Sequence, residues 1–105
     1  MQAYASGTEA VDDTGTAIDL TAGAPAGISH CILRWRVLDA GAPVALAPPG
    51  LAATYAKGAE AASASGETAS AGAYRITGGN PTLICDAGSS ASVAWVLYAL
   101  TDEQP

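Results

Sequence analysis

The chain has 105 residues, of which 50% are hydrophobic, but 25 are alanine, so about half of the apolar side chains are single methyl groups. Ten acidic residues against four basic ones give a net charge of −6 (4 − 10 = −6), and the basic residues do not cluster, which argues against a nucleic-acid-binding surface. No apolar run approaches the roughly 18 residues of a membrane span, and the N-terminus lacks the basic start and apolar stretch of a secretion signal, so we expect a protein made in the cytoplasm.

The sequence predicts one small domain with an N-terminal extension. Residues 1–15 are small and polar apart from Tyr4 and Val11. No local core can form there, so we expect an extended arm that either stays loose or docks. Residues 16–105 are expected to fold as a single domain, whose thin core would gain stability from a partner surface.

Residues 16–21 form the first predicted strand, because Ile18 and Leu20 recur with the period of two that is typical of a half-buried strand. Residues 22–27 contain Pro25, which has no backbone donor for a ladder, and are predicted to be a loop. The first strand is therefore expected to be short.

The strongest strand of the first half spans residues 28–38. Its alternate positions from Cys31 to Val37 are apolar and are expected to face the core. The opposite face mixes Arg34 and Arg36 with apolar residues, which is the character of a contact surface as much as of a solvated one.

The middle of the chain offers weaker signals. Residues 44–47 fit a short strand, residues 48–50 a proline turn, and residues 51–57 either a strand or a single helical turn. Residues 58–72 contain no large apolar side chain, so an exposed loop is predicted for them in preference to an alanine-rich helix.

Three antiparallel strands in a meander are predicted for the last third, over residues 73–77, 82–85 and 91–100, with a hairpin turn at residues 78–81. The final strand is apolar on both faces, so a second sheet, a loop or a neighbouring subunit should cover each side. Without an amphipathic helix pattern, these strands predict an all-β fold: a small antiparallel β-sandwich or a jelly-roll-like barrel with an extended N-terminal arm.

The two cysteines, Cys31 and Cys85, are far apart in the sequence and lie in apolar surroundings. This spacing excludes a CxxC redox pair and a cysteine-only zinc site. Two buried thiols are the preferred interpretation, and a disulfide stays open because the sequence does not give their separation.

No constellation of residues points to catalysis, a cofactor or a metal. His30 is the only histidine, and its neighbour Ser29 should face the opposite way on a strand, so a Ser–His pair is not expected. The acidic pairs at 12–13 and 102–103 lie where nothing would desolvate them, and neither has calcium-loop spacing. We predict a protein without enzymatic activity, cofactor or metal site.

Residues 73–85, AYRITGGNPTLIC, and residues 92–98, SVAWVLY, resemble the small Ala- and Gly-rich β-sandwich accessory proteins of tailed-phage virions. The resemblance implies a non-enzymatic structural protein of the virion. Its expected role is that of a decoration or cement protein that binds and stabilises the capsid lattice, with a homotrimer favoured. A tail, baseplate or adaptor component is the alternative, because such proteins share these small β folds.

Six residues are candidates for contacts with copies of this chain, with the major capsid protein or with another virion protein. They are Tyr4 and Val11 in the arm, the basic residues Arg34, Arg36 and Arg75, and Tyr98 on the final strand. Guanidinium groups pair well with carboxylates at interfaces, which makes the arginines the expected polar anchors.

A free-standing glycan-binding sandwich is a second hypothesis. Exposed aromatic side chains often bind sugars, and Tyr4, Tyr55 and Tyr98 are the candidates for this role. Under either hypothesis no nucleic acid and no membrane is expected as a partner.

Overall fold

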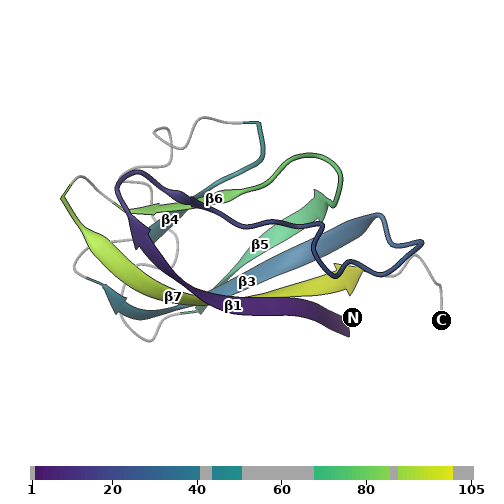
Figure 1. Cartoon of the computed structure of the whole chain (residues 1–105), viewed down its shortest axis with the longest axis horizontal. Helices are drawn as coiled ribbons and strands as arrows, with labels where there is room; N and C mark the ends of the chain where they lie inside the picture. The colour runs from purple at the N-terminus through teal and green to yellow at the C-terminus, as the bar shows by residue number, and fades with distance from the viewer. Residues whose placement is uncertain (1, 41–43, 51–67, 86–87, 101–105) are drawn as a thin grey trace.

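The computed structural model describes residues 2–40, 44–50, 68–85 and 88–100, and within them the chain forms seven strands and no helix. The strands make two antiparallel sheets that lie face to face (Figure 1). The larger sheet has the order β1 (Gln2–Asp12), β7 (Ser90–Leu100), β3 (His30–Ala40), β5 (Thr68–Arg75). The smaller sheet has the order β2 (Thr16–Ala17), β6 (Thr82–Cys85), β4 (Val44–Ala47). The predicted all-β sandwich is confirmed.

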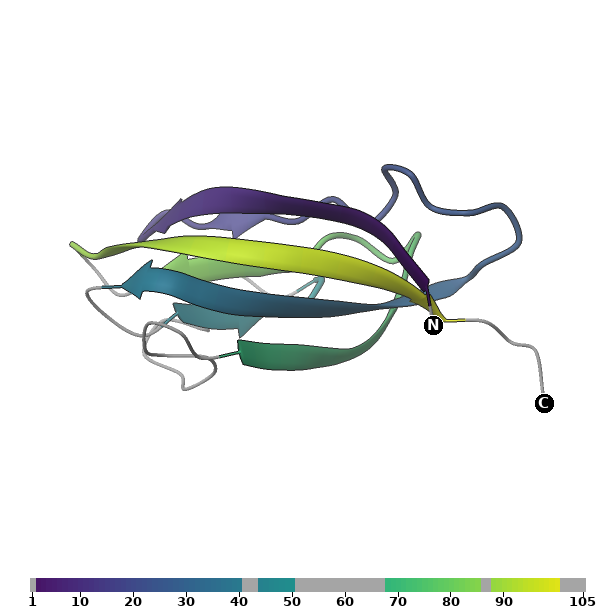
Figure 2. The same ribbon diagram turned by 90° about the horizontal axis from the view of Figure 1, so that it is seen from below.

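Successive strands of the described chain lie in opposite sheets, the odd-numbered ones in the larger sheet and the even-numbered ones in the smaller. β7 pairs with both β1 and β3, so the first and last strands are neighbours in a layer of long strands (Figure 2). This alternation makes the sandwich jelly-roll-like, although the described residues contain seven strands and a jelly roll has eight.

The core lies between the inner faces of the two sheets. The period of two turns Leu33, Val37, Val93 and Leu97 of the larger sheet inward, and all four are completely buried. The core also contains Val11, Ile18, Leu20, Cys31, Trp35, Val44, Ile76, Leu83, Cys85 and Ala91. The predicted core face of residues 28–38 is therefore confirmed, and the two cysteines are buried thiols that form no disulfide, as preferred from the sequence.

The smaller sheet is apolar on both faces. Ala45, Ala47 and Ile84 form a second small buried cluster on the side that faces away from the main core. β4 confirms the short strand predicted over residues 44–47.

The N-terminal segment takes the docked form, one of the two forms that the sequence left open. Residues 2–12 are extended, as expected, and they form β1, which pairs with β7 along its length. Val11 is completely buried. The neighbouring strand supplies the bulk that β1 lacks: the Trp95 ring lies over Gly7, where a Cβ atom would come within 2.9 Å of the ring.

Tyr4 lies at a β-bulge of β1, and its hydroxyl bonds to the loop that follows β2. The β1–β7 register shifts between Ala3 and Ala5, and the Tyr4 hydroxyl donates a hydrogen bond to the Leu20 carbonyl oxygen at 2.7 Å. The Leu20 amide donates in turn to Asn80 Oδ1 at 3.1 Å. Leu20 is fully buried outside any strand, so these two bonds satisfy its backbone polar groups.

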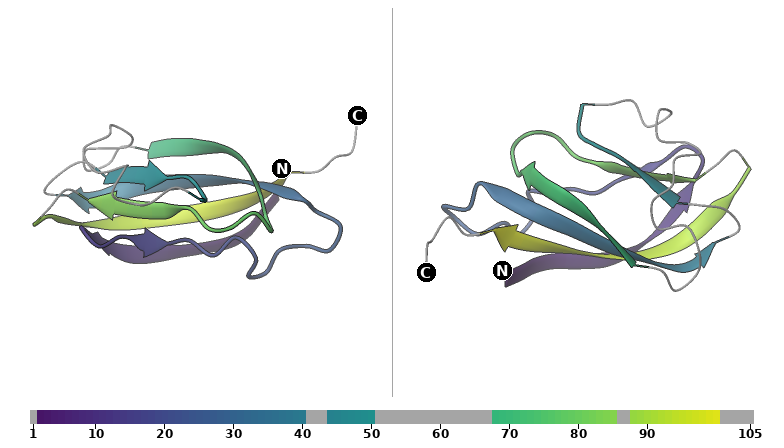
Figure 3. Two further views of the ribbon diagram at one scale, coloured as in Figure 1. Left: turned by 90° about the horizontal axis from the view of Figure 1, so that it is seen from above. Right: turned by 180° about the vertical axis from the view of Figure 1, so that it is seen from behind.

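The predicted meander of the last third is wrong. β5, β6 and β7 alternate between the sheets, so residues 78–81 carry the chain from the larger sheet to the smaller one and are not a hairpin turn (Figure 3). The Ile18 amide donates to the Pro81 carbonyl oxygen at 2.9 Å, which holds this connection against the segment that follows β2. Sequence spacing does not separate a hairpin from a crossing of equal length, because both use the same turn residues.

Two other predicted segments have different bounds in the structure. The loop predicted over residues 58–72 is wrong at its C-terminal end, because β5 begins at Thr68 and pairs with β3, which supplies the large side chains. The strand predicted over residues 16–21 shortens to β2, although Ile18 and Leu20 are buried as expected. Residues 51–57 and 58–67 lie outside the described residues.

Val11→Ala tests whether β1 belongs to the core. The substitution removes two buried carbon atoms and should lower the free energy of unfolding by roughly 2 kcal/mol, cavity included. Thr8→Ala, at an exposed position of the same strand, is the matched control and should stay within about 0.5 kcal/mol of the wild type. Urea unfolding followed by tryptophan fluorescence measures all three proteins; equal values for the two variants would mean that β1 is a loose arm.

Candidate functional site

The outer face of the larger sheet, made of the side chains that point away from the smaller sheet, is open in the described part of the chain. Ile32, Val96, Tyr98 and Leu100 are partly exposed there, and Leu38 is 48% exposed. The register sets Ile32 on β3 beside Tyr98 on β7, so Ile32, Val96, Tyr98 and Leu100 make one apolar strip. Leu38 lies further along β3, beyond Arg34 and Arg36.

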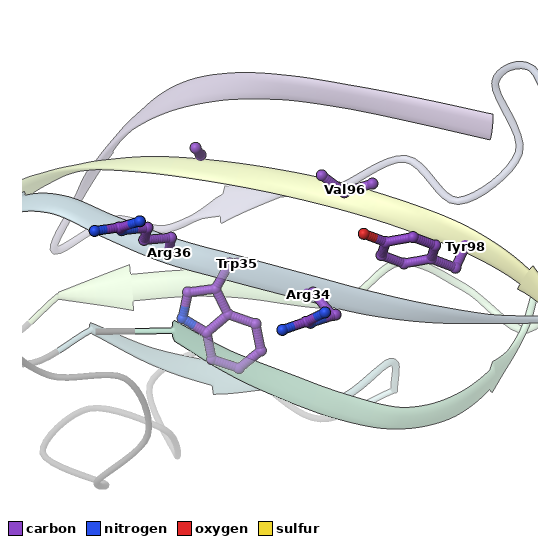
Figure 4. Close-up of a pocket in the computed structure, with 6 residues that line it drawn as sticks. Arg34, Trp35, Arg36, Val96 and Tyr98 are labelled. Carbon is purple, nitrogen blue, oxygen red and sulfur yellow. The ribbon is translucent and has the colours of Figure 1, made fainter. Parts of the chain in front are cut away.

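Arginine side chains border this strip. Arg34 and Arg36 are exposed on β3, and the register sets Arg34 beside Val96 and Arg36 beside Ala94. With Tyr98 these side chains line a shallow groove of about 160 Å³ (Figure 4). A guanidinium group is weakly hydrated, so it enters an interface more readily than an ammonium group does.

The outer face is basic although the whole chain is acidic. Three of the four basic residues lie on it, the third being Arg75, which is exposed on β5 and paired with His30 in the ladder. Within the described residues, no ion pair joins any of the three guanidinium groups to a carboxylate. Four described carboxylates make other contacts: Glu9 with Trp95 Nε1, Asp13 with the Gly88 amide, and Asp12 and Asp19 within their own turns.

The two turn aspartates are held in the charged form. The Thr14 hydroxyl lies 2.6 Å from Asp12 Oδ1, and this bond, together with that from the Thr14 amide, lowers the pKa of Asp12. The Thr21 amide and hydroxyl lower the pKa of Asp19 in the same way. These carboxylates therefore order their turns and do not neutralise the outer face.

Four of the six candidate interface residues, Arg34, Arg36, Arg75 and Tyr98, lie on the outer face. Tyr4 and Val11 do not share this surface: Val11 is completely buried and Tyr4 packs against the core. β1 turns both side chains toward the interior, so Val11 is inaccessible to a partner, whereas Tyr4 stays partly exposed and its role at an interface remains a prediction. Trp35, Ala94 and Val96 also line the groove and were not candidates. For Ala94 and Val96, the period of two in the final strand is the signal that marks them.

Ser29 and His30 are closer than the sequence predicts. Ser29 Oγ lies 2.8 Å from His30 Nδ1 in an exposed position. The expected opposite orientation is wrong, because β3 begins at His30 and strand alternation does not extend to Ser29. No described carboxylate orients the imidazole ring, so the pair lacks the third group of a hydrolytic triad within the described residues.

Among the described residues, no three His, Cys, Asp or Glu side chains gather in a group that could hold a metal ion. Those same residues contain no helix that is long and apolar enough to cross a membrane.

No family model matches the chain, and no curated protein or solved structure matches it significantly. The outer face therefore carries the functional inference by itself.

A separate group of buried hydroxyl and thiol side chains lies beneath the sheet. Burial raises the pKa of Tyr4 well above its usual value, and the nearby Cys31 thiol raises it further. Burial likewise raises the pKa of Cys31, although its hydrogen bond with Tyr4 acts in the opposite direction. Burial also raises the pKa of Tyr74. The folded chain therefore keeps these protons at a pH where the unfolded chain releases them.

The free energy of unfolding should consequently fall as the pH rises above about 9 to 10, the range in which the unfolded chain loses these protons first. The stability from each raised pKa is complete below the unfolded value and is lost as the pH rises through the folded value. Tyr4→Phe should make this decline shallower, while costing about 1 kcal/mol near neutral pH through the lost bond to Leu20. Urea unfolding across this pH range measures both effects, and an unchanged slope would contradict them.

Arg34→Ala combined with Arg36→Ala should leave the free energy of unfolding within about 1 kcal/mol of the wild type, because exposed and unpaired surface positions contribute about 0.5 kcal/mol or less each. Urea unfolding gives the comparison. A larger decrease in the free energy of unfolding would show that the two guanidinium groups stabilise the fold itself and are not simply unpaired surface groups.

Proposed function

We propose that the protein is a non-enzymatic structural component of a phage virion, a decoration or cement protein that binds the capsid lattice through the outer face of its larger sheet. The observation that carries the proposal is the apolar strip with unpaired arginines on that face. An isolated protein gains nothing from holding Ile32, Val96 and Tyr98 partly in water, whereas a contact surface needs such an apolar centre.

The arginines suit a partner that carries carboxylates. Arg34 and Arg36 lie two residues apart on β3, beside the apolar side chains of Val96 and Ala94 on β7. Interface anchors often combine a planar guanidinium group with neighbouring apolar side chains from which the partner excludes water. Major capsid protein is the partner in this proposal, with contact in the virion after synthesis in the host cytoplasm.

The fold and the composition support this role. Jelly rolls occur in viral capsid domains as well as in lectins, so the strand order fits but does not select the function by itself. A chain in which about half of the apolar residues are alanine has few bulky side chains to bury, and it gains stability when a second surface covers the open face.

Co-sedimentation with phage heads tests the proposal. Heads and tails are purified from a phage that encodes the chain but is grown without it, and purified protein is added back. We expect saturable binding to heads, lost in the Arg34→Ala, Arg36→Ala double variant. Binding to tails alone would favour the tail or baseplate alternative, and binding to neither would remove the virion role.

A control variant separates local contacts from net charge. The Arg34→Ala, Arg36→Ala protein has a net charge of −8 (−6 − 2 = −8), and Ala22→Glu with Ala26→Glu, in an exposed loop away from the outer face, gives the same total. The loop variant should bind heads like the wild type. Equal loss in both variants would attribute binding to overall charge.

The glycan-binding alternative has one observation in its favour, the partly exposed Tyr98 beside the arginine-lined groove. A sugar that stacks on this ring should raise the melting temperature of the isolated protein, and Tyr98→Ala should abolish the rise. Thermal unfolding in the presence of a panel of neutral and acidic sugars provides the measurement.

A further inference from the structure

The free edge of β1 presents unpaired backbone groups. The Ala10 carbonyl oxygen accepts a hydrogen bond from Thr16 Oγ1 at 3.1 Å, so it points away from β7. Alternate residues of a strand direct their amide and carbonyl groups to the same side. The backbone groups of Ser6 and Thr8 therefore also point away from β7, and no described residue bonds to them on that side.

This open stretch has two structural limits. At one end Thr16 covers the Ala10 carbonyl oxygen. At the other end lies the bulge at Tyr4, where the loop approaches so closely that a Cβ atom on Gly23 would lie 3.1 Å from the Tyr4 carbonyl oxygen. Residues 5–9 thus form an accessible window on the edge, named the edge window below.

The edge window carries only part of the usual protection of exposed strands: the Glu9 carboxylate faces the inner side of the sheet beside Trp95, and a bulge lies at Tyr4. Edge strands commonly carry proline, lysine or an inward charge that prevents pairing with another chain. Residues 2–12 contain no proline, lysine or arginine, and Ala5, Ser6, Gly7 and Thr8 within the window are small. A second backbone can therefore approach at the normal distance between strands.

An aromatic side chain lies directly behind the window. The Trp95 ring covers Gly7 on the inner side of the sheet, remains partly exposed, and donates from Nε1 to Glu9 Oε2 at 3.3 Å. A partly exposed tryptophan held rigidly beside unpaired backbone groups is a typical centre of a protein interface.

We propose that β1 pairs with β1 of a second copy of this chain, antiparallel and across a twofold axis at Gly7. The pairing joins the two larger sheets into one continuous sheet and brings the two Trp95 rings together at the axis. A second copy is the occupant because the edge window is complementary to itself, as its register shows.

In that register Ser6 of each copy lies opposite Thr8 of the other, and Ala5 lies opposite Glu9. Hydroxyl side chains that face each other across strands stabilise the pair, and no two like charges are opposed. The outward groups of Ser6 and Thr8 then bond reciprocally, while Gly7 leaves the axis free of side chains.

The dimer is independent of the proposed virion role, since it uses the edge of the sheet and leaves the outer face open. It sets the two outer faces side by side, with their arginines on one continuous surface. Twofold pairing also differs from the threefold association that the resemblance implies.

Sedimentation equilibrium of the isolated protein tests the pairing through proline at the edge. The Thr8 amide points away from β7, so Thr8→Pro removes an intermolecular donor and keeps the β1–β7 ladder. We expect the wild type and Thr8→Ala to be dimers in a concentration-dependent equilibrium, and Thr8→Pro to be a folded monomer by circular dichroism, with a dissociation constant raised at least about tenfold. Dimerisation of Thr8→Pro with wild-type affinity would overturn the proposal.

A charge pair tests the register without changing the backbone. Ser6→Lys with Thr8→Lys opposes like charges across the axis and should raise the dissociation constant at least about tenfold, although it lowers the net negative charge of the chain. Ser6→Glu with Thr8→Lys keeps the net charge and sets each glutamate opposite a lysine, so it should restore the dimer. Equal weakening of the dimer in both variants would contradict the register. If Thr8→Pro does not fold, this comparison of the charge variants takes its place as the test.

The oligomeric state of the wild type decides the symmetry. A monomer at every concentration, or a trimer that Thr8→Pro leaves intact, would overturn the twofold pairing. Neither result bears on capsid binding, which is read from co-sedimentation and from the arginine variants.

Discussion

Burial of one face of the larger sheet against the smaller sheet is the interaction on which the rest of the structure depends. Leu33 and Leu97 of the larger sheet share one buried core with the inner side chains of β4 and β6. Most of the bulky apolar side chains of the described chain are used in this core. Hydrophobic burial scales with apolar area, so a chain rich in alanine has little left to cover a second face. The smaller sheet packs on the inner side, and no other described strand covers the outer face.

The open parts of the described structure are of two kinds with different physics. The outer face offers apolar area with charged groups, which gives non-directional attraction and selects partners by charge complementarity. The edge of β1 offers hydrogen-bonding groups at fixed spacing, which gives directional pairing and a defined register. A protein that uses both can associate with itself through one surface and with a larger assembly through the other.

Because the domain is small, a partner bound at either surface would add a large fraction of its net stability. A domain of this length buries little more than about 60% of its unfolded surface, and its net stability is a small difference between large terms. Binding of a partner to the folded state alone adds stability in proportion to the logarithm of its concentration over the dissociation constant. The contacts of Tyr4 with Leu20, and of Leu20 with Asn80, show the complementary strategy, in which directional bonds fix a buried loop where apolar bulk is scarce.

The sequence by itself determined the fold class, the core face of β3 and the two-sided apolar character of β7, because side-chain alternation is a local property that is printed in the order of residues. It also marked Arg34, Arg36 and Tyr98 as interface candidates, and the pairing of β3 with β7 sets them on one face. Only the tertiary structure decided that Val11 faces the core, that β5 and β6 belong to different sheets, and that Ser29 reaches His30. The reason is that strand pairing joins residues that are distant in the sequence. Gly7 has no side chain of its own to pack, and it lies in a strand because β1 pairs with β7 and the Trp95 ring of β7 packs over it.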